Sequence, residues 1–174
     1  LLINLSCSNN QITSLGLSNN TALTILKCSI NQLTSLDVTN NTALEYLSFN
    51  DNQLTSIDVS QNTDLGFLHC NNNQLTALNV SQNINLGQLN CNNNQLGTLD
   101  VSGAIALYEL DCEHNNLFFL NLGNTLNLAS LTLKAAGNSS SLTISVGTPG
   151  RKNYADANFT VANGSISSGT TFII

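Results

Sequence analysis

Five cysteines share a 21-residue interval and are the residues of this chain best suited to chemistry. They are Cys7, Cys28, Cys70, Cys91 and Cys112, and Phe49 and Leu133 fill the two remaining positions of the series. Regularly spaced thiols could form disulfides, bind a metal ion such as zinc, or supply a nucleophile. Which of these is possible depends on the elements that hold the thiols.

The same interval runs through most of the sequence, so the cysteines belong to a repeated unit. Starting at Leu23, one unit reads Leu-x-x-Leu-x-Cys-x-x-Asn-x-Leu-x-x-Leu-x-Val, followed by five connecting residues. The alternation in Leu-x-Cys predicts a short strand, and Leu-x-Val predicts a second extended segment on the other side of each turn. Five residues are too few for a useful α-helix, so we expect turns or 3₁₀ structure in the connections. Stacked units of this kind form a rod.

Stacked strands place the cysteine side chains in a column instead of a cluster. Neighbouring parallel strands are about 4.8 Å apart, whereas the two Cβ atoms of a disulfide are about 3.8 Å apart. An odd number of cysteines also leaves one unpaired. A column does not converge on one metal ion, and apolar positions do not favour a reactive thiolate. We therefore predict that the cysteines are small hydrophobic core residues, with no catalytic residues, no metal ligands and no cofactor.

An asparagine follows each cysteine position by three residues, at positions 10, 31, 52, 73, 94 and 115. A buried carboxamide can donate and accept hydrogen bonds without carrying a charge. It therefore suits a place where the chain turns away from a strand and leaves backbone groups inside. We predict that this asparagine column bonds to the backbone of the turns.

The pattern Leu-x-x-Leu-x-(Leu/Cys)-x-x-Asn-x-Leu, repeated from Leu2 to Leu133, resembles the leucine-rich repeat. The 21-residue length, the cysteine in the strand and the segment Asn-Gln-Leu-Thr-Ser-Leu-Asp-Val at 31–38 resemble more narrowly bacterial surface repeats of the internalin J type and secreted proteins of Bacteroidetes. This resemblance implies a right-handed solenoid with a parallel β-sheet on its concave face, turns and 3₁₀ structure on its convex face, and almost no α-helix. It also implies a recognition or adhesion module instead of an enzyme.

The repeat pattern fails after Leu133, because position 9 of a seventh unit is Ala136 and not asparagine. The remaining residues are rich in Ser, Thr and Gly, and segments 142–146, 158–161 and 170–174 read as short strands. An open solenoid end exposes apolar core and unpaired edge groups. We therefore predict two parts: a solenoid of six full repeats and a partial seventh at 1–133, and a β-rich C-terminal cap at 134–174.

If every repeat shares the core, the variable residues beside the strand must carry any binding function. In the geometry that the resemblance implies, these residues line the concave face. The candidate ligand-binding residues are Ile25, Tyr46, Phe67, His69, Glu109, Asp111 and Glu113. Tyr46 and Phe67, one repeat apart, could anchor a protein or a sugar ring, or could only stabilise each other by cross-strand stacking. The acidic residues could bind a partner or be a solvated surface.

Asp37, Asp58 and Asp100 form a further acidic column on the outside of the repeats, interrupted by Asn79. Carboxylates one repeat apart repel each other, so a bound Ca²⁺ is one explanation of this column. Screening by solvent, helped by the uncharged Asn79, is the other explanation.

The composition of the chain argues against two classes of partner, nucleic acid and the membrane interior. A net charge of −6 with four basic residues leaves no basic stripe for nucleic acid, and no apolar run is long enough to insert into a membrane. The leading hypothesis is recognition of a protein or carbohydrate on another surface; the alternative is a structural spacer or stalk that presents another domain. The resemblance implies an extracellular or cell-surface location. Because the chain has no methionine and starts within the repeat pattern, we expect a fragment or a processed product without its signal peptide.

Overall fold

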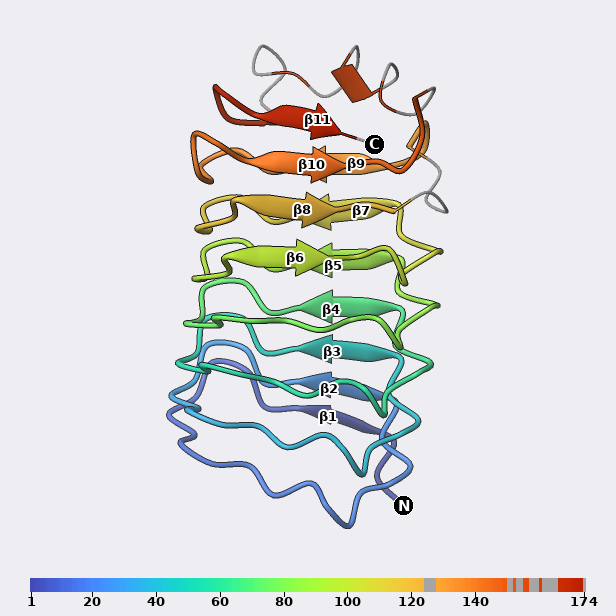
Figure 1. Ribbon diagram of the computed structural model, residues 1–174. Helices are drawn as coiled ribbons and strands as arrows, with labels where there is room; N and C mark the ends of the chain where they lie inside the picture. Colours follow the sequence, from blue (N-terminus) through green and yellow to red (C-terminus); the bar gives the residue numbers. More distant parts are fainter. Residues whose placement is uncertain (124–127, 150–151, 153–154, 157–159, 161–165, 174) are drawn as a thin grey trace.

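The repeats stack into a solenoid of about seven turns (Figure 1). The computed structural model describes residues 1–123, 128–149, 152, 155–156, 160 and 166–173. One side of the solenoid is a parallel seven-stranded sheet with the order β1-β2-β3-β4-β5-β7-β9. Its strands are β1 (Asn4–Ser6), β2 (Ile25–Lys27), β3 (Tyr46–Ser48), β4 (Phe67–His69), β5 (Gln88–Asn90), β7 (Glu109–Asp111) and β9 (Thr132–Lys134). The predicted solenoid of short parallel strands is confirmed.

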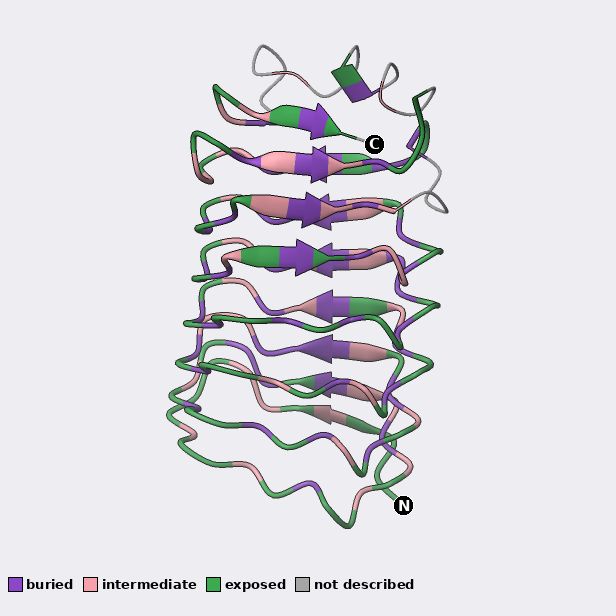
Figure 2. Ribbon diagram, viewed as in Figure 1, coloured by how far each residue is buried: buried purple, intermediate pink, exposed green. Residues whose placement is uncertain are grey.

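Neighbouring strands pair so that equivalent residues of successive repeats lie side by side. Leu47 of β3, for example, pairs with Leu26 of β2 and with Leu68 of β4. These three leucines are fully buried, because side chains alternate along a strand and the middle residue points into the core. Figure 2 shows the buried centres of the strands one above another. Each buried leucine contributes about 1.5–3 kcal/mol to the stack.

The opposite side of the solenoid is a sheet only towards the C-terminus. Its strands are β6 (Thr98–Asp100), β8 (Phe119–Asn121), β10 (Thr143–Ser145) and β11 (Thr171–Ile173), in the order β11-β10-β8-β6. In residues 1–97, all of them described, the predicted second extended segments form no strand, and only Asn79 makes an isolated bridge, to Asp100. The N-terminal turns therefore spread apart on this side (Figure 1), which makes the seven-stranded side their concave side.

The core is a continuous column of leucines, valines and cysteines inside the turns. All five cysteines are free, and all but Cys7 are fully buried. Burial raises the pKa of the thiols of Cys28 and Cys70 to about 12. Phe49, which takes a cysteine position, is fully buried as well. The prediction that the cysteines are small hydrophobic core residues is confirmed for these four, and Cys7 packs against the core while only partly buried.

The asparagine column bonds successive turns to one another. The side-chain Nδ2 of Asn52 donates to the carbonyl of Phe49 in its own turn at 3.0 Å and to that of Cys28 in the preceding turn at 3.1 Å. Its Oδ1 accepts the backbone N–H of Leu33 at 2.9 Å. The same pattern recurs at Asn73 and in the following turns. This role was predicted, and it is confirmed.

The interval from the sixth turn to the seventh, between β7 and β9, is two residues longer than the earlier intervals. Leu133 pairs with Leu110, 23 residues earlier, so it does not continue the column of cysteines. The buried Ala135 takes that position instead. Asn138 then takes the asparagine position, because its Nδ2 donates to the carbonyls of Cys112 and Ala135, each at 2.9 Å. The predictions that Leu133 extends the cysteine series and that the asparagine pattern fails after it are wrong, because two extra residues precede β9.

A column of left-handed residues precedes the asparagine column and was not predicted. These residues have φ between 51° and 60° and are Asn9, Ile30, Asp51, Asn72, Asn93 and His114. Gly137 takes the equivalent place in the seventh turn, with φ of 70°. Asparagine, aspartate and glycine tolerate this conformation, whereas a β-branched residue such as Ile30 is strained by it.

A second column of buried asparagines, also not predicted, lies in the connecting segments. This column consists of Asn41, Asn62 and Asn83, which are fully buried. Each Nδ2 donates to two backbone carbonyls of the preceding turn. These bonds link the connecting segments of successive turns to one another.

On the second side, β10 of the seventh turn pairs with β8, and β11 then pairs with β10. Ala135 forms an isolated bridge with Ile166. Strands predicted at 142–146 and 170–174 are therefore confirmed, with bounds 143–145 and 171–173. The strand predicted at 158–161 lies outside the described residues, apart from Thr160. The division of the chain into a solenoid and a cap stays a prediction. Within the described parts of the chain, no helical segment combines the length and the apolar character needed to cross a membrane.

Candidate functional site

The outward side chains of the seven-stranded sheet form one surface, which we call the seven-stranded face. Along the turns it presents Asn4, Ser6, Ile25, Lys27, Tyr46, Ser48, Phe67, His69, Gln88, Asn90, Glu109, Asp111, Thr132 and Lys134. Of the seven predicted binding residues, all but Glu113 belong to this face, and Glu113 lies two residues beyond the end of β7. The sheet holds them on a rigid support, because every strand between β1 and β9 is paired on both sides.

Three aromatic rings meet on β3 and β4. The ring centroids of Tyr46 and Phe67 are 5.8 Å apart, and the rings are tilted by 33°. The ring of His69 meets that of Tyr46 edge-on at 5.4 Å, and the Tyr46 hydroxyl hydrogen-bonds with His69 Nδ1 at 3.2 Å. The Lys27 ammonium lies 5.1 Å from the Tyr46 ring centroid, at cation–π distance. Ile25, half-buried on β2, pairs with Tyr46 in the sheet. We call Lys27, Tyr46, Phe67 and His69 the aromatic cluster.

The aromatic cluster is only partly shielded from solvent. Phe67 is 38% exposed, while Tyr46 and His69 are half-buried. Burial lowers the pKa of the His69 imidazole, although the negative charge of Glu109 and a hydrogen bond with Gln88 raise it in part. His69 therefore favours its neutral form, in which it can keep the hydrogen bond to Tyr46.

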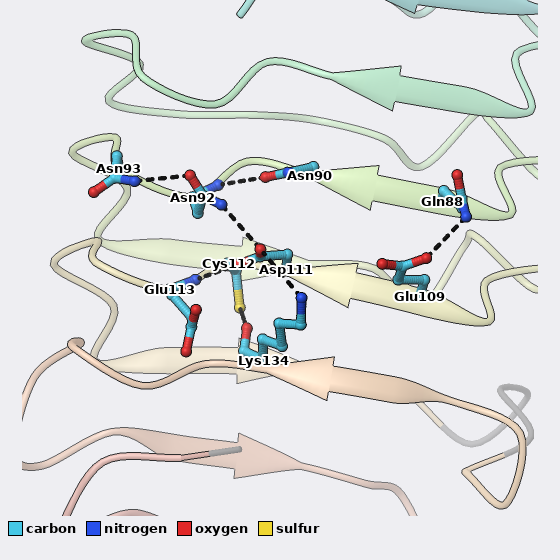
Figure 3. A network of polar contacts seen from close by, with 9 residues as sticks. All are labelled: Gln88, Asn90, Asn92, Asn93, Glu109, Asp111, Cys112, Glu113 and Lys134. Carbon is cyan, nitrogen blue, oxygen red and sulfur yellow. Dashed lines mark hydrogen bonds and ion pairs between the residues drawn. The ribbon is translucent and has the colours of Figure 1, made fainter. Parts of the chain in front are cut away.

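A hollow of about 210 Å³ lies next to the aromatic cluster. It is lined by His69, Gln88, Leu89, Asn90, Glu109 and Asp111. Gln88 Nε2 donates to Glu109 Oε2 at 2.8 Å, across the pair β5 and β7 (Figure 3). The hollow thus combines two carboxylates with amide groups and the edge of an imidazole ring. His69 belongs to both the cluster and the hollow, so the two form one continuous region of the face.

Asp111 is the most restrained of the predicted acidic residues. It is only 7% exposed, although an exposed acidic patch was expected. Asn92 Nδ2 donates to its Oδ2 at 2.9 Å, and the backbone N–H of Glu113 donates to its Oδ1 at 3.2 Å. The ammonium of Lys134 lies 4.0 Å from Asp111 Oδ2 (Figure 3). Asp111 is buried because the neighbouring turns supply these partners on both sides. Glu113 itself does not line the hollow.

Several residues of this region were missing from the predicted site. Lys27, Gln88 and Asn90 stand beside predicted residues on neighbouring strands, and Gln88 lies one 21-residue interval before Glu109. That spacing could have identified Gln88. Lys134 could not be found in this way, because the longer interval between β7 and β9 brings it opposite Asp111 across 23 residues.

The carboxylates of Asp37, Asp58 and Asp100 accept hydrogen bonds from the backbone of the turns that follow them. Asp37 Oδ1 accepts the backbone N–H of Thr39 at 3.0 Å and its hydroxyl at 2.7 Å, and Asp58 Oδ1 accepts the N–H of Ser60 at 2.9 Å. These hydrogen bonds lower the pKa of Asp37 and of Asp58. Asp100 makes the same contact two residues on, so the three carboxylates close Asx turns. Among the described residues, no group of three or more His, Cys, Asp or Glu side chains could hold a metal ion.

Comparison with solved structures shows which known fold the chain shares. No protein-family model matches the chain, and no curated protein sequence is significantly similar to it. A solved leucine-rich repeat protein of Leptospira interrogans, however, is 26% identical over 90% of this chain and 41% of its own length, with a TM-score of 0.72. The chain is a leucine-rich repeat protein.

Two further solved leucine-rich repeat structures are from Listeria monocytogenes. The internalin InlF is 21% identical over 99% of this chain and 43% of its own, with a TM-score of 0.63. The functional domain of InlJ, which includes a cysteine ladder, is 30% identical over 83% of this chain and 44% of its own, with a TM-score of 0.40. The chain spans less than half the length of each of these structures.

Proposed function

We propose that this leucine-rich repeat chain is a non-enzymatic recognition module that binds a partner through the seven-stranded face. The observation that carries the proposal is the aromatic cluster. Its rings are held by contacts among Lys27, Tyr46 and His69, while Phe67 keeps 38% of its surface exposed. Large aromatic side chains dominate binding hot spots, because they bury much area while losing little conformational freedom.

Two properties of the support favour binding over mutual stacking alone. The rings stand on the middle strands of a continuous sheet, so a partner can contact several turns at once. The adjoining hollow adds hydrogen-bonding groups within reach of a molecule seated on Phe67. A site with an aromatic platform and a few polar groups suits a protein segment or a carbohydrate ring. Such a partner would be carried on another surface, which fits an extracellular or cell-surface location for this chain.

The test is an array of proteins and glycans probed with three labelled forms of the chain. These are the wild type, the double variant Tyr46→Ala with Phe67→Ala, and Phe118→Ala as a matched control. Phe118 is 57% exposed and lies outside the seven-stranded face, so its loss removes aromatic surface without changing that face. We expect ligands that are retained by the wild type and by the control and lost by the double variant.

The opposite results point to the other function considered for this chain. If the wild type binds nothing on the arrays, or if all three forms bind equally, the proposal fails. The chain would then act as a spacer that holds another domain at a distance, for which the identity of the residues at 46 and 67 would not matter.

A further inference from the structure

The hollow beside the aromatic cluster has more hydrogen-bond acceptors than donors. One of the two N–H groups of Gln88 Nε2 is used by Glu109 Oε2, and one of the two of Asn92 Nδ2, just outside the hollow, is used by Asp111 Oδ2. The Oδ1 of Asn90 accepts the backbone N–H of Asn92 at 3.2 Å. A carboxylate only accepts, and each of its oxygens has room for two donors. The groups left for a ligand are therefore mainly acceptors, and two of them belong to carboxylates.

The chain already turns one of its own cations towards this hollow. The Lys134 ammonium lies 4.0 Å from Asp111 Oδ2, and the lysine side chain is 48% exposed. Figure 3 shows the Lys134 side chain reaching towards Asp111, on the side of Asp111 away from Asn92. This distance exceeds that of a charge-assisted hydrogen bond, so the contact is a loose one that a better-placed cation can replace.

We propose that the hollow receives the cationic end of an arginine or lysine side chain from an extended segment of a protein partner. This inference deepens the proposed function, on which it rests. A guanidinium carries five N–H donors and no acceptor, which matches a surplus of acceptors, and its charge is opposite to that of Glu109 and Asp111. The volume of about 210 Å³ suits the end of one side chain, with the aromatic cluster left for the neighbouring residue of the same segment.

A neutral sugar fits the same hollow less well. Each sugar hydroxyl both donates and accepts, so a sugar needs free donors from the protein as well as acceptors. One N–H of the Gln88 amide is already used inside the face, and the few amide donors that remain are outnumbered by the oxygens of the two carboxylates. The chain's net charge of −6 also attracts a basic segment over distances of about 10 Å at moderate ionic strength.

The test is an NMR titration of the chain with N-acetyl-arginine amide, followed through the side-chain amide signals of Gln88 and Asn90. N-acetyl-citrulline amide, which has nearly the same shape without the charge, is the matched ligand, and methyl glucoside is the sugar probe. We expect only the arginine compound to shift these signals, with an apparent affinity that falls as salt is added.

Three variants sharpen this test. Glu109→Gln keeps the shape and the contact with Gln88 but removes the charge, so we expect the affinity for the arginine compound to fall about tenfold. Lys134→Gln removes the internal competitor, so we expect binding to tighten about two- to fivefold. Glu45→Gln removes an exposed carboxylate that does not line the hollow, and it should leave the affinity unchanged.

The inference is overturned if no compound shifts the two amide signals, if citrulline amide shifts them as strongly as arginine amide, or if only the sugar does. It is also overturned if Glu109→Gln and Glu45→Gln weaken binding equally. The proposed function can survive that failure, because a ligand found on the arrays and lost with Tyr46 and Phe67 would still show recognition by the face.

Discussion

The side-chain oxygen of Asn73 accepts the backbone N–H of Leu54, 19 residues earlier, at a distance of 3.0 Å. The amide nitrogen of the same side chain donates to the carbonyls of Phe49 at 3.1 Å and Cys70 at 3.2 Å. One uncharged side chain thus satisfies backbone groups from two successive turns. It also fixes how one turn is placed on the next, so it helps to set the position of every side chain on the seven-stranded face.

Replacing Asn73 with alanine should lower the free energy of unfolding by about 1–3 kcal/mol, because three buried backbone groups lose a partner. Urea denaturation followed by circular dichroism measures this change. Gln74→Ala is the control, since Gln74 is the exposed neighbour and its loss should have little effect. Equal stabilities of the two variants would show that the asparagine column is not a source of stability.

Replacing Ile30 with asparagine should raise the free energy of unfolding by about 0.5–1 kcal/mol. Ile30 has φ of 56° and is 48% exposed, so its β-branched side chain is strained in the left-handed conformation and contributes little to the core. The converse variant, Asn93→Ile, places the same strain at φ of 52° and should be destabilising. A destabilising effect of Ile30→Asn in thermal or urea unfolding would contradict this explanation.

The five thiols should differ in their reactivity. Cys7 is partly exposed in the first turn, whereas Cys70 is fully buried with its pKa raised to about 12 and carries almost no thiolate at pH 8. Titration of the native chain with a thiol reagent should therefore modify Cys7 first, and the other four only after unfolding. Simultaneous modification of all five, or a crosslink between cysteines in the native chain, would refute the buried column.

The imidazole of His69 should titrate below its ordinary pKa of about 6.5 in the folded chain, because burial disfavours its charged form. A lowered folded pKa means that the unfolded chain binds more protons. His69 therefore contributes stability above pH 6.5 that is lost as the pH falls through its folded pKa. NMR of the His69 ring gives this pKa directly, against the same chain unfolded in urea. Tyr46 hydrogen-bonds with the ring, and Glu109 and Asp111 line the same hollow. Glu109→Gln should lower the pKa of His69 further, since the charge of Glu109 raises it. A pKa above 6.5 would contradict the burial of this ring.

The repeat interval accounts for most of what could be predicted from the sequence. The leucine and asparagine positions of Leu26 and Asn31 recur in six turns and the cysteine position of Cys28 in five of them, and this spacing was sufficient to predict the strands, the core and the asparagine column. The same interval placed Tyr46, Phe67 and His69 together on one face, where their rings are in contact. A periodic pattern specifies which residues of neighbouring turns meet, because stacked parallel strands keep equivalent residues side by side.

Other features depend on contacts that the interval does not contain. The two extra residues before β9 move Lys134 next to Asp111 and bring Asn138 into the asparagine column, and no residue type marks that insertion. The burial of Asp111 follows from its neighbours on two different turns, Asn92 and Lys134. Strand pairing on the second side begins only at Thr98, although the Leu-x-Val pattern is present from the earlier turns. In the turns before Thr98 this side spreads apart, so the same sequence pattern occurs with a different spacing between turns.

The central claim is that a partner binds on the seven-stranded face through Tyr46 and Phe67. The most direct measurement is the dissociation constant of a ligand identified on the arrays for the double variant Tyr46→Ala with Phe67→Ala, relative to wild type and Phe118→Ala. We expect the double variant to bind at least about tenfold more weakly while its melting temperature stays within a few degrees of wild type and Phe118→Ala binds normally. Equal dissociation constants for the double variant and the wild type would contradict the claim.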